Sequence, residues 1–220
     1  MSRASLDTLV HVHRPGSDRD APTLLLLHGT GADEHDLLPL GEMLASDARL
    51  LSPRGRVSEQ GMPRWFSRHA EGVFDHEDLV ARTHELADWL EHATEQYEVD
   101  RTRLVAAGFS NGANIAASML LLRPETLRAA LLFAPMLPFE PDTLPDLSHA
   151  AAFISAGRRD PICPPEQAER LAELLSDAGA AVELSWHDGG HQLDRAQAVQ
   201  GHAWLQRWRD ATATDPDGLA

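Results

Sequence analysis

Lysine is absent from this chain of 220 residues, and all nineteen of its basic residues are arginine. Catalysis through a Schiff base, attachment of pyridoxal phosphate and the phosphate-binding lysine of a P-loop each require a lysine side chain. The sequence therefore excludes these three classes of enzyme.

Cysteine and long apolar runs are also scarce. The single cysteine, Cys163, excludes an internal disulfide and a cysteine-rich zinc site. Apolar runs such as residues 129–134 are far too short to span a bilayer, and residues 1–7 lack the apolar segment of a secretory signal. We therefore expect a cytoplasmic protein.

Acidic residues outnumber basic ones by 34 to 19, which gives a formal net charge of −15. This excess is expected to repel nucleic acid and anionic membranes, so we predict no nucleic-acid partner and no stable membrane association. The length and the apolar content of 43% fit one globular domain over residues 1–220, with a core at about 9–210 and a frayed tail at 211–220. The sequence is also compatible with a homodimer.

Apolar runs and amphipathic patterns alternate along the chain. We expect strands at residues 9–13, 23–27, 49–51, 104–107, 129–133, 151–157 and 181–186. Helices are expected at 36–46, 77–97, 165–177 and 195–210, with a further helix after residue 110 that ends at Arg123-Pro124. This alternation predicts an α/β fold, with a mostly parallel central sheet and helices on both faces. The proline-rich residues 135–145 lack an amphipathic helical pattern, so no large lid domain is expected.

The stretch around Ser110 carries the main chemical signal. An apolar strand candidate runs into Gly108-Phe109-Ser110-Asn111-Gly112, and helix-forming residues follow at once. The two glycines suit a backbone that reverses within a few residues and passes close to its neighbours. The five-residue pattern alone also fits an ordinary turn. The order of strand, tight turn and helix predicts that Ser110 is a nucleophile held at the tip of the turn.

A serine hydroxyl needs a base, and we interpret His191, on the Gly189-Gly190 loop, as that base. Asp160 follows the strand at 151–157 and is expected to orient the imidazole. The backbone N–H groups of Thr30 and Asn111 are predicted to stabilise the oxyanion. Because these loops follow predicted strands, and the carboxyl ends of parallel strands meet at one edge of a sheet, the side chains are expected to converge.

Other residues compete for these roles. His187 is the alternative base, and Asp188 and Asp194 are alternative acids, although both lie beside His191 in the sequence. A metal site at His187 and His191 is not expected, because the intervening glycines break the helix that would align the two rings. Cys163 lies among prolines and is interpreted as a packed free thiol rather than as a nucleophile.

Four apolar residues in predicted loops are candidates for contact with a substrate. Trp65 and Phe66 lie in a long irregular loop through residues 61–66, where anchoring the core and lining a substrate pocket fit the pattern equally well. Met136 and Leu137 follow the strand at 129–133 and could either contact a substrate or simply pack.

Four motifs, in this order, resemble the phospholipase/carboxylesterase family of α/β-hydrolases, which is close to the dienelactone hydrolases: His28-Gly29-Thr30-Gly31, Gly108-Phe109-Ser110-Asn111-Gly112, Arg159-Asp160-Pro161 and Gly189-Gly190-His191. Two further segments, Ser52-Pro53-Arg54-Gly55 and Trp65-Phe66, resemble those of the branch of this family that is associated with hydroquinone-responsive hydrolases. One departure is Thr30, where many members have leucine. The resemblance implies an α/β-hydrolase fold, a triad of Ser110, Asp160 and His191, oxyanion amides from Thr30 and Asn111, and no cofactor.

From the residues and the resemblance together, we expect a serine carboxylesterase. Its substrates would be small esters of short to medium acyl chain, hydrolysed through an acyl-enzyme on Ser110. Thioesterase, lysophospholipase and dienelactone hydrolase activities use the same machinery and are the alternatives. The alternative from another class is a noncatalytic ligand-binding protein of the same fold, which usually lacks a triad member, whereas this chain has a candidate for each.

Overall fold

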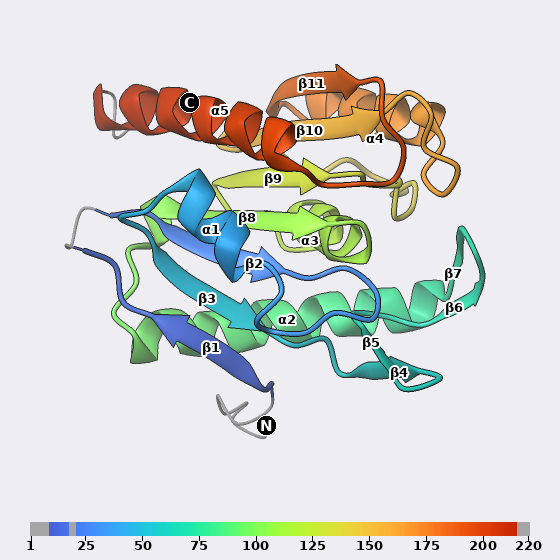
Figure 1. Cartoon of the computed structure of the whole chain (residues 1–220), viewed down its shortest axis with the longest axis horizontal. Helices are drawn as coiled ribbons and strands as arrows, with labels where there is room; N and C mark the ends of the chain where they lie inside the picture. Colours follow the sequence, from blue (N-terminus) through green and yellow to red (C-terminus); the bar gives the residue numbers. More distant parts are fainter. Residues whose placement is uncertain (1–8, 18–20, 215–220) are drawn as a thin grey trace.

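The computed structural model describes residues 9–17 and 21–214, and a seven-stranded sheet forms its centre (Figure 1). In spatial order the strands are β1 (His11–Arg14), β3 (Arg49–Pro53), β2 (Thr23–Leu27), β8 (Leu104–Phe109), β9 (Ala129–Phe133), β10 (Ala151–Gly157) and β11 (Ala181–His187). Strand β1 runs antiparallel to β3, and the other five pairs are parallel. The predicted mostly parallel sheet is confirmed.

Helices cover both faces of this sheet (Figure 1). On one face lie α1 (Leu38–Leu44) and α5 (Arg195–Thr214), and on the other lie α2 (His76–Gln96), α3 (Asn111–Leu122) and α4 (Pro165–Asp177). A short 3-10 helix, η2 (Arg101–Arg103), precedes β8. In the part of the chain that the structure describes, no helix has the length and apolarity needed to cross a membrane.

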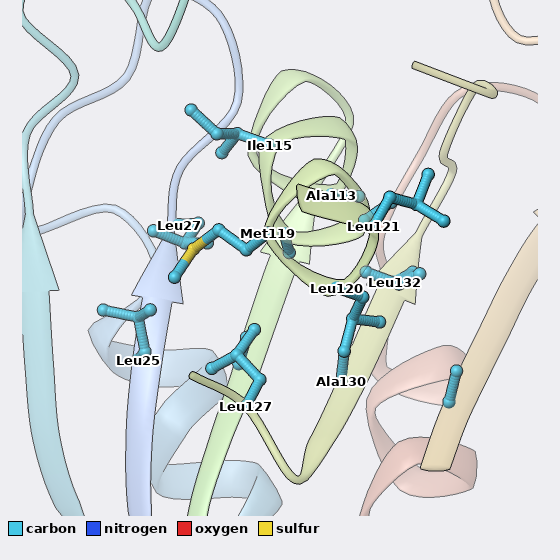
Figure 2. Close-up of a cluster of buried hydrophobic side chains, with 14 of the residues drawn as sticks. Leu25, Leu27, Ala113, Ile115, Met119, Leu120, Leu121, Leu127, Ala130 and Leu132 are labelled. Carbon is cyan, nitrogen blue, oxygen red and sulfur yellow. The ribbon is translucent and has the colours of Figure 1, made fainter. Parts of the chain in front are cut away.

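The alternation of side chains along each strand divides the core into two layers. Leu24 and Leu26 of β2 belong to the layer under α1 and α5, whereas Leu25 and Leu27 belong to the layer under α2, α3 and α4. Figure 2 shows Met119 of α3 beside Leu27 of β2, in the layer to which Leu25 also belongs. Because both faces of these strands are buried, they are continuously apolar in sequence.

Local signals account for the start of α2 and for both ends of α4. Asp75 caps the start of α2, because its side chain accepts a hydrogen bond from the N–H of Asp78. Helix α4 has the predicted bounds, beginning at Pro165 and ending before Gly179, whose φ of +98° suits glycine. Helix α5 continues to Thr214, which corrects the predicted tail for residues 211–214. Residues 1–8 and 215–220, which complete the predicted domain and tail, lie outside the described residues.

A short hairpin takes the place of much of the irregular loop predicted through residues 61–66, and a second hairpin follows it. Strands β4 (Val57–Glu59) and β5 (Met62–Arg64) form the first, and β6 (Arg68–Ala70) and β7 (Val73–Phe74) form the second. Gln60 and Gly61 have φ values of +52° and +85°, the left-handed conformation of a two-residue hairpin turn. Between β9 and β10, where residues 134–150 are all described, no helix forms.

Candidate active site

Ser110 lies in the tight turn between β8 and α3, with φ of +53° and ψ of −116°. Its N–H donates to the carbonyl of Phe133 at 2.9 Å. A Cβ on Gly112 would stand 1.8 Å from the carbonyl oxygen of Leu27, and one on Gly108 would stand 2.4 Å from that of Gly112. Only glycines permit this close approach, and the turn places Ser110 at the carboxyl edge of the sheet.

Three predicted side chains meet at this edge. The Oγ of Ser110 lies 2.9 Å from Nε2 of His191, and Nδ1 of His191 lies 2.8 Å from Oδ2 of Asp160. An ionised carboxylate can only accept hydrogen bonds, so Nδ1 carries the proton and donates a hydrogen bond to Asp160. Nε2 is thereby left as the acceptor for the Ser110 hydroxyl. The side chain of Asp160 is 1% exposed and that of His191 is 14% exposed, so the pair is largely shielded from water.

The Asp160 carboxylate is fixed by its own loop. Its second oxygen, Oδ1, accepts from the N–H groups of Ile162 at 2.8 Å and Cys163 at 2.9 Å. These bonds hold the carboxylate toward the imidazole. Burial raises the pKa of the Cys163 thiol to about 12, so this side chain is a protonated, packed thiol at neutral pH, as expected.

Backbone contacts hold the Asp160 loop and the His191 loop together. The N–H of Arg158 donates to the carbonyl of His187 at 2.8 Å, and the N–H of Arg159 donates to the carbonyl of Gly189 at 3.1 Å. A Cβ on Gly157 would stand 2.6–2.7 Å from the carbonyls of Gly189 and Gly190. The imidazole and its acid are therefore held by two loops bonded to each other.

The competing residues have other partners. Nδ1 of His187 accepts from the N–H of Gly189 at 3.2 Å, within its own loop. Asp194 accepts from the N–H of Ala196 at 2.8 Å at the start of α5. Asp188 is exposed, and its backbone carbonyl accepts from Nε of Arg159 at 2.6 Å. Asp160 is the acid that this structure places against His191.

Two backbone N–H groups, those of Thr30 and Asn111, have no hydrogen-bond acceptor among the described residues. The N–H of Gly31 donates to the carbonyl of Pro63 at 2.9 Å, whereas that of Thr30 has no acceptor among the described residues. Asn111 is the first residue of α3, so its N–H has no partner within the helix. Thr30 and Asn111 are the two residues predicted to supply the oxyanion hole.

The ring of His28 anchors the loop that carries Thr30. Its Nε2 accepts from the N–H of Gly55 at 2.9 Å, so Nδ1 donates to the carbonyl of Gly29 at 2.7 Å. Burial lowers the pKa of His28, although the bond to Gly29 opposes this effect. Arg54 also donates to Glu34 at 2.7 Å. The Ser52-Pro53-Arg54-Gly55 segment therefore positions the loop after β2.

Arg64, which no sequence pattern singled out, also holds this loop. Its side chain is 3% exposed, and Nη1 donates to Oγ1 of Thr30 at 2.9 Å and to Oε2 of Glu59 at 3.3 Å. Its Nε donates to the carbonyl of Phe66 at 3.2 Å. The hydroxyl of Thr30 thus has a specific partner, which a leucine would not bond. A lone arginine in a predicted loop gives no sequence signal for this role.

The four candidates for substrate contact are packed to different degrees. Trp65 is 3% exposed and donates from Nε1 to the carbonyl of His28 at 2.9 Å, and Phe66 is fully buried. For this pair the structure favours core anchoring over the lining of a pocket. Met136 is 8% exposed, and its N–H donates to Oδ1 of Asn114 on α3 at 2.8 Å. Leu137 is half-buried and packs against the core layer under α2, α3 and α4. Substrate contact by any of the four remains a prediction.

Within the described residues, two groups bring three possible metal ligands within 4.8 Å of one another. One consists of Asp160, His191 and the protonated thiol of Cys163, and therefore shares its ligands with the hydrogen-bonded chain to Ser110. The other consists of the adjacent residues 33–35, where Glu34 is already bonded to Arg54. Neither arrangement indicates a resident metal.

Comparisons with known proteins identify the family of this chain. Residues 10–206 match the family model described as Phospholipase/Carboxylesterase. A Bacillus subtilis (strain 168) protein named "Putative hydrolase MhqD" is 48% identical over 196 residues, which cover 89% of this chain and 97% of that protein.

Solved structures similar to this chain include two carboxylesterases. The Bacillus cereus carboxylesterase is 47% identical with a TM-score of 0.89, over 90% of this chain and 94% of that one. A carboxylesterase from Mesorhizobium loti is 32% identical with a TM-score of 0.81, over 87% of this chain and 90% of that one. The predicted α/β-hydrolase fold is confirmed.

Proposed function

The chain belongs to the phospholipase/carboxylesterase family and is a hydrolase, and we propose that it is a serine carboxylesterase that works through an acyl-enzyme on Ser110. The observation that carries this proposal is the unbroken hydrogen-bonded chain from Ser110 through His191 to Asp160, at 2.9 Å and 2.8 Å. A serine hydroxyl is a weak nucleophile at neutral pH, and this chain is the means of activating it.

In the first half of the reaction, Oγ of Ser110 attacks the ester carbonyl carbon while Nε2 of His191 takes the hydroxyl proton. The Asp160 carboxylate stabilises the imidazolium that forms. The carbonyl oxygen becomes an oxyanion, and the N–H groups of Thr30 and Asn111 stabilise it by about 3 kcal/mol each. His191 then returns the proton to the alkoxy oxygen, the bond from the carbonyl carbon to that oxygen breaks, and the alcohol leaves.

In the second half, a water molecule replaces the alcohol. His191 takes a proton from the water as its oxygen attacks the acyl carbon, and the same two N–H groups hold the second oxyanion. The bond to Oγ breaks, Ser110 recovers its proton from His191, and the carboxylic acid is released. No cofactor takes part in either half.

The acyl group that we infer is short to medium in length. The β4–β5 hairpin packs against the loop that carries Thr30, since Met62 lies 3.6 Å from the position of a Cβ on Gly31. No helix between β9 and β10 extends the site as a lid. A small ester fits these surroundings better than a long lipid chain.

Covalent labelling tests the nucleophile. An alkyl fluorophosphonate should add one equivalent to the wild-type protein, on the peptide that contains Ser110, and Ser110→Ala should remove the label. A Ser118→Ala variant is the matched control, because Ser118 lies on α3 and is fully buried, and it should label normally. Labelling that persists in Ser110→Ala would overturn the proposal.

A further inference from the structure

Trp65 is hydrogen-bonded to both segments that are predicted to supply the oxyanion hole. Its indole Nε1–H donates to the carbonyl of His28 at 2.9 Å, and its backbone N–H donates to Oδ1 of Asn111 at 2.8 Å. We call these two hydrogen bonds the Trp65 bridge. His28 precedes Thr30 by two residues in the loop after β2, and Asn111 is the first residue of α3. One residue therefore links the carriers of the two predicted N–H groups.

Both hydrogen bonds of the Trp65 bridge are shielded from water. Trp65 and Asn111 are each 3% exposed, and His28 is 1% exposed. The indole ring also lies against the imidazole of His28, with the ring centroids 5.1 Å apart. Because water cannot easily replace a lost partner at such a site, a broken bond would leave a buried polar group unsatisfied. Trp65 is thus fixed in position relative to both segments.

The two segments meet where Trp65 bonds them. A Cβ on Gly112, the second residue of α3, would stand 2.6 Å from the carbonyl oxygen of His28. That oxygen is the one that accepts from the indole of Trp65. The loop after β2 and the first turn of α3 are therefore in close contact, and Trp65 is bonded to each side of this contact.

We propose that Trp65 is a positioning residue that fixes the separation between the N–H groups of Thr30 and Asn111. This role rests on the proposed esterase function. The two N–H groups belong to different elements, and both must lie about 2.7–3.1 Å from one oxyanion to stabilise it. A displacement of about 1 Å can cost about a hundredfold in rate. Because Trp65 bonds both elements, it would act on the reaction through Thr30 and Asn111 and not by contact with the substrate.

Kinetics of a Trp65→Phe variant test this role, because the substitution removes the indole N–H and keeps a buried aromatic ring. Both halves of the proposed reaction pass through an oxyanion, so we expect kcat for p-nitrophenyl acetate to fall about tenfold or more with KM little changed. A trifluoromethyl ketone forms an anionic tetrahedral adduct with Ser110, so its inhibition constant should rise by a similar factor. The amplitude of the p-nitrophenol burst counts intact active sites and should stay near one equivalent.

Trp208→Phe is the matched control. Trp208 lies on α5 and is 7% exposed, and its Nε1 has no hydrogen-bond partner among the described residues. The control variant therefore loses the same atoms from a buried site without losing a hydrogen bond, and its kcat and inhibition constant should stay at the wild-type values. Wild-type kcat in Trp65→Phe, or a fall explained by a smaller burst amplitude alone, would overturn the positioning role.

A double-mutant cycle tests whether the two hydrogen bonds act as one bridge. Asn111→Ala removes the acceptor of the second bond and keeps the N–H of residue 111, so kcat should again fall with KM little changed. Because either substitution opens the bridge, Trp65→Phe combined with Asn111→Ala should lower kcat by less than the product of the two single effects. Single effects that multiply in full would overturn the bridge.

Activity of the wild-type protein separates this inference from the esterase proposal. A wild-type protein that gives neither a burst nor turnover with p-nitrophenyl acetate would overturn the esterase proposal and the positioning role with it. Wild-type turnover with unchanged kinetics in Trp65→Phe would overturn the positioning role alone.

Discussion

At the scale of single residues, three donors converge on the carboxylate of Asp160. His191 donates to Oδ2, and the N–H groups of Ile162 and Cys163 donate to Oδ1. In an Asp160→Asn variant the amide oxygen can still accept from the two N–H groups, which leaves the NH₂ group facing Nδ1 of His191. The imidazole would then carry its proton on Nε2, where it cannot accept from Ser110.

We therefore expect Asp160→Asn to lower kcat about ten-thousandfold, as loss of the orienting acid does in other serine hydrolases. The measurement is steady-state hydrolysis of p-nitrophenyl acetate, with thermal unfolding as a check on the fold. Asp188→Asn and Asp194→Asn are the matched controls and should keep wild-type kcat. Full activity in Asp160→Asn would transfer the orienting role to another residue.

His28 gives a prediction about pH. Burial lowers the pKa of its imidazole from the usual value of about 6.5. Below about pH 6.5 the unfolded chain therefore binds a proton at this position that the folded chain does not, so the free energy of unfolding falls as the pH drops. The contribution of His28 to the free energy of unfolding is fully present above about pH 6.5, and it is lost as the pH falls toward the pKa of His28 in the folded state.

A His28→Asn variant should be less stable than wild type at pH 8, because the bond from Gly55 is lost, yet its stability should decline less between pH 7 and pH 5. Urea unfolding at several pH values measures both effects. Burial also lowers the pKa of His13, which is present in both proteins, so the difference between their pH profiles isolates His28. Parallel profiles would contradict the assignment.

At the scale of elements, the β4–β5 hairpin supports the loop after β2. The carbonyl of Pro63 accepts from the N–H of Gly31, and Arg64 donates to the hydroxyl of Thr30. A Thr30→Val variant keeps the shape of the side chain and removes the acceptor, which leaves the buried guanidinium of Arg64 short of one partner. Such a loss costs about 1–3 kcal/mol and loosens the loop that carries one N–H of the proposed oxyanion hole.

We expect Thr30→Val to lower kcat about tenfold, because small displacements of an oxyanion donor are costly. Thr30→Ser keeps the hydroxyl and should restore most of kcat. Comparison of kcat and KM for p-nitrophenyl acetate separates a loosened oxyanion donor, which lowers kcat, from an altered substrate pocket, which raises KM. A change confined to KM would contradict the supporting role.

Elements with strong local signals could be predicted from the sequence, and those that depend on distant contacts could not. Helix α4 has a proline at its start and a glycine after its end, and its predicted and observed bounds agree. The two hairpins were missed because strands of two or three residues carry no periodicity. Arg64 was missed for a related reason, since Thr30 lies 34 residues earlier in the chain.

At the scale of the whole molecule, the parallel sheet explains how two distant residues reach Ser110. Asp160 lies 50 positions after Ser110 in the sequence, and His191 lies 81 positions after it. Asp160 and His191 follow β10 and β11, whose carboxyl ends lie at the same edge as that of β8. This convergence could be predicted because crossover connections place successive parallel strands in one orientation. The side-chain distances could not, because they depend on how the two loops bond to each other.

The net charge of −15 leads to a prediction for the whole surface. We expect no co-sedimentation with phosphatidylserine vesicles at low ionic strength, since repulsion between like charges is strongest there. Phosphatidylcholine vesicles are the control and should behave in the same way. Sedimentation with the anionic vesicles that added salt abolishes would contradict the prediction.

Hydrolysis through an ester on Ser110 can be tested by rapid quenching followed by peptide mass spectrometry. Mixing the enzyme with excess p-nitrophenyl acetate should release a burst of about one equivalent of p-nitrophenol. One acetyl group should appear at the same time on the peptide that contains Ser110. Turnover without acetylation of that peptide, or an undiminished rate in Ser110→Ala, would contradict the account.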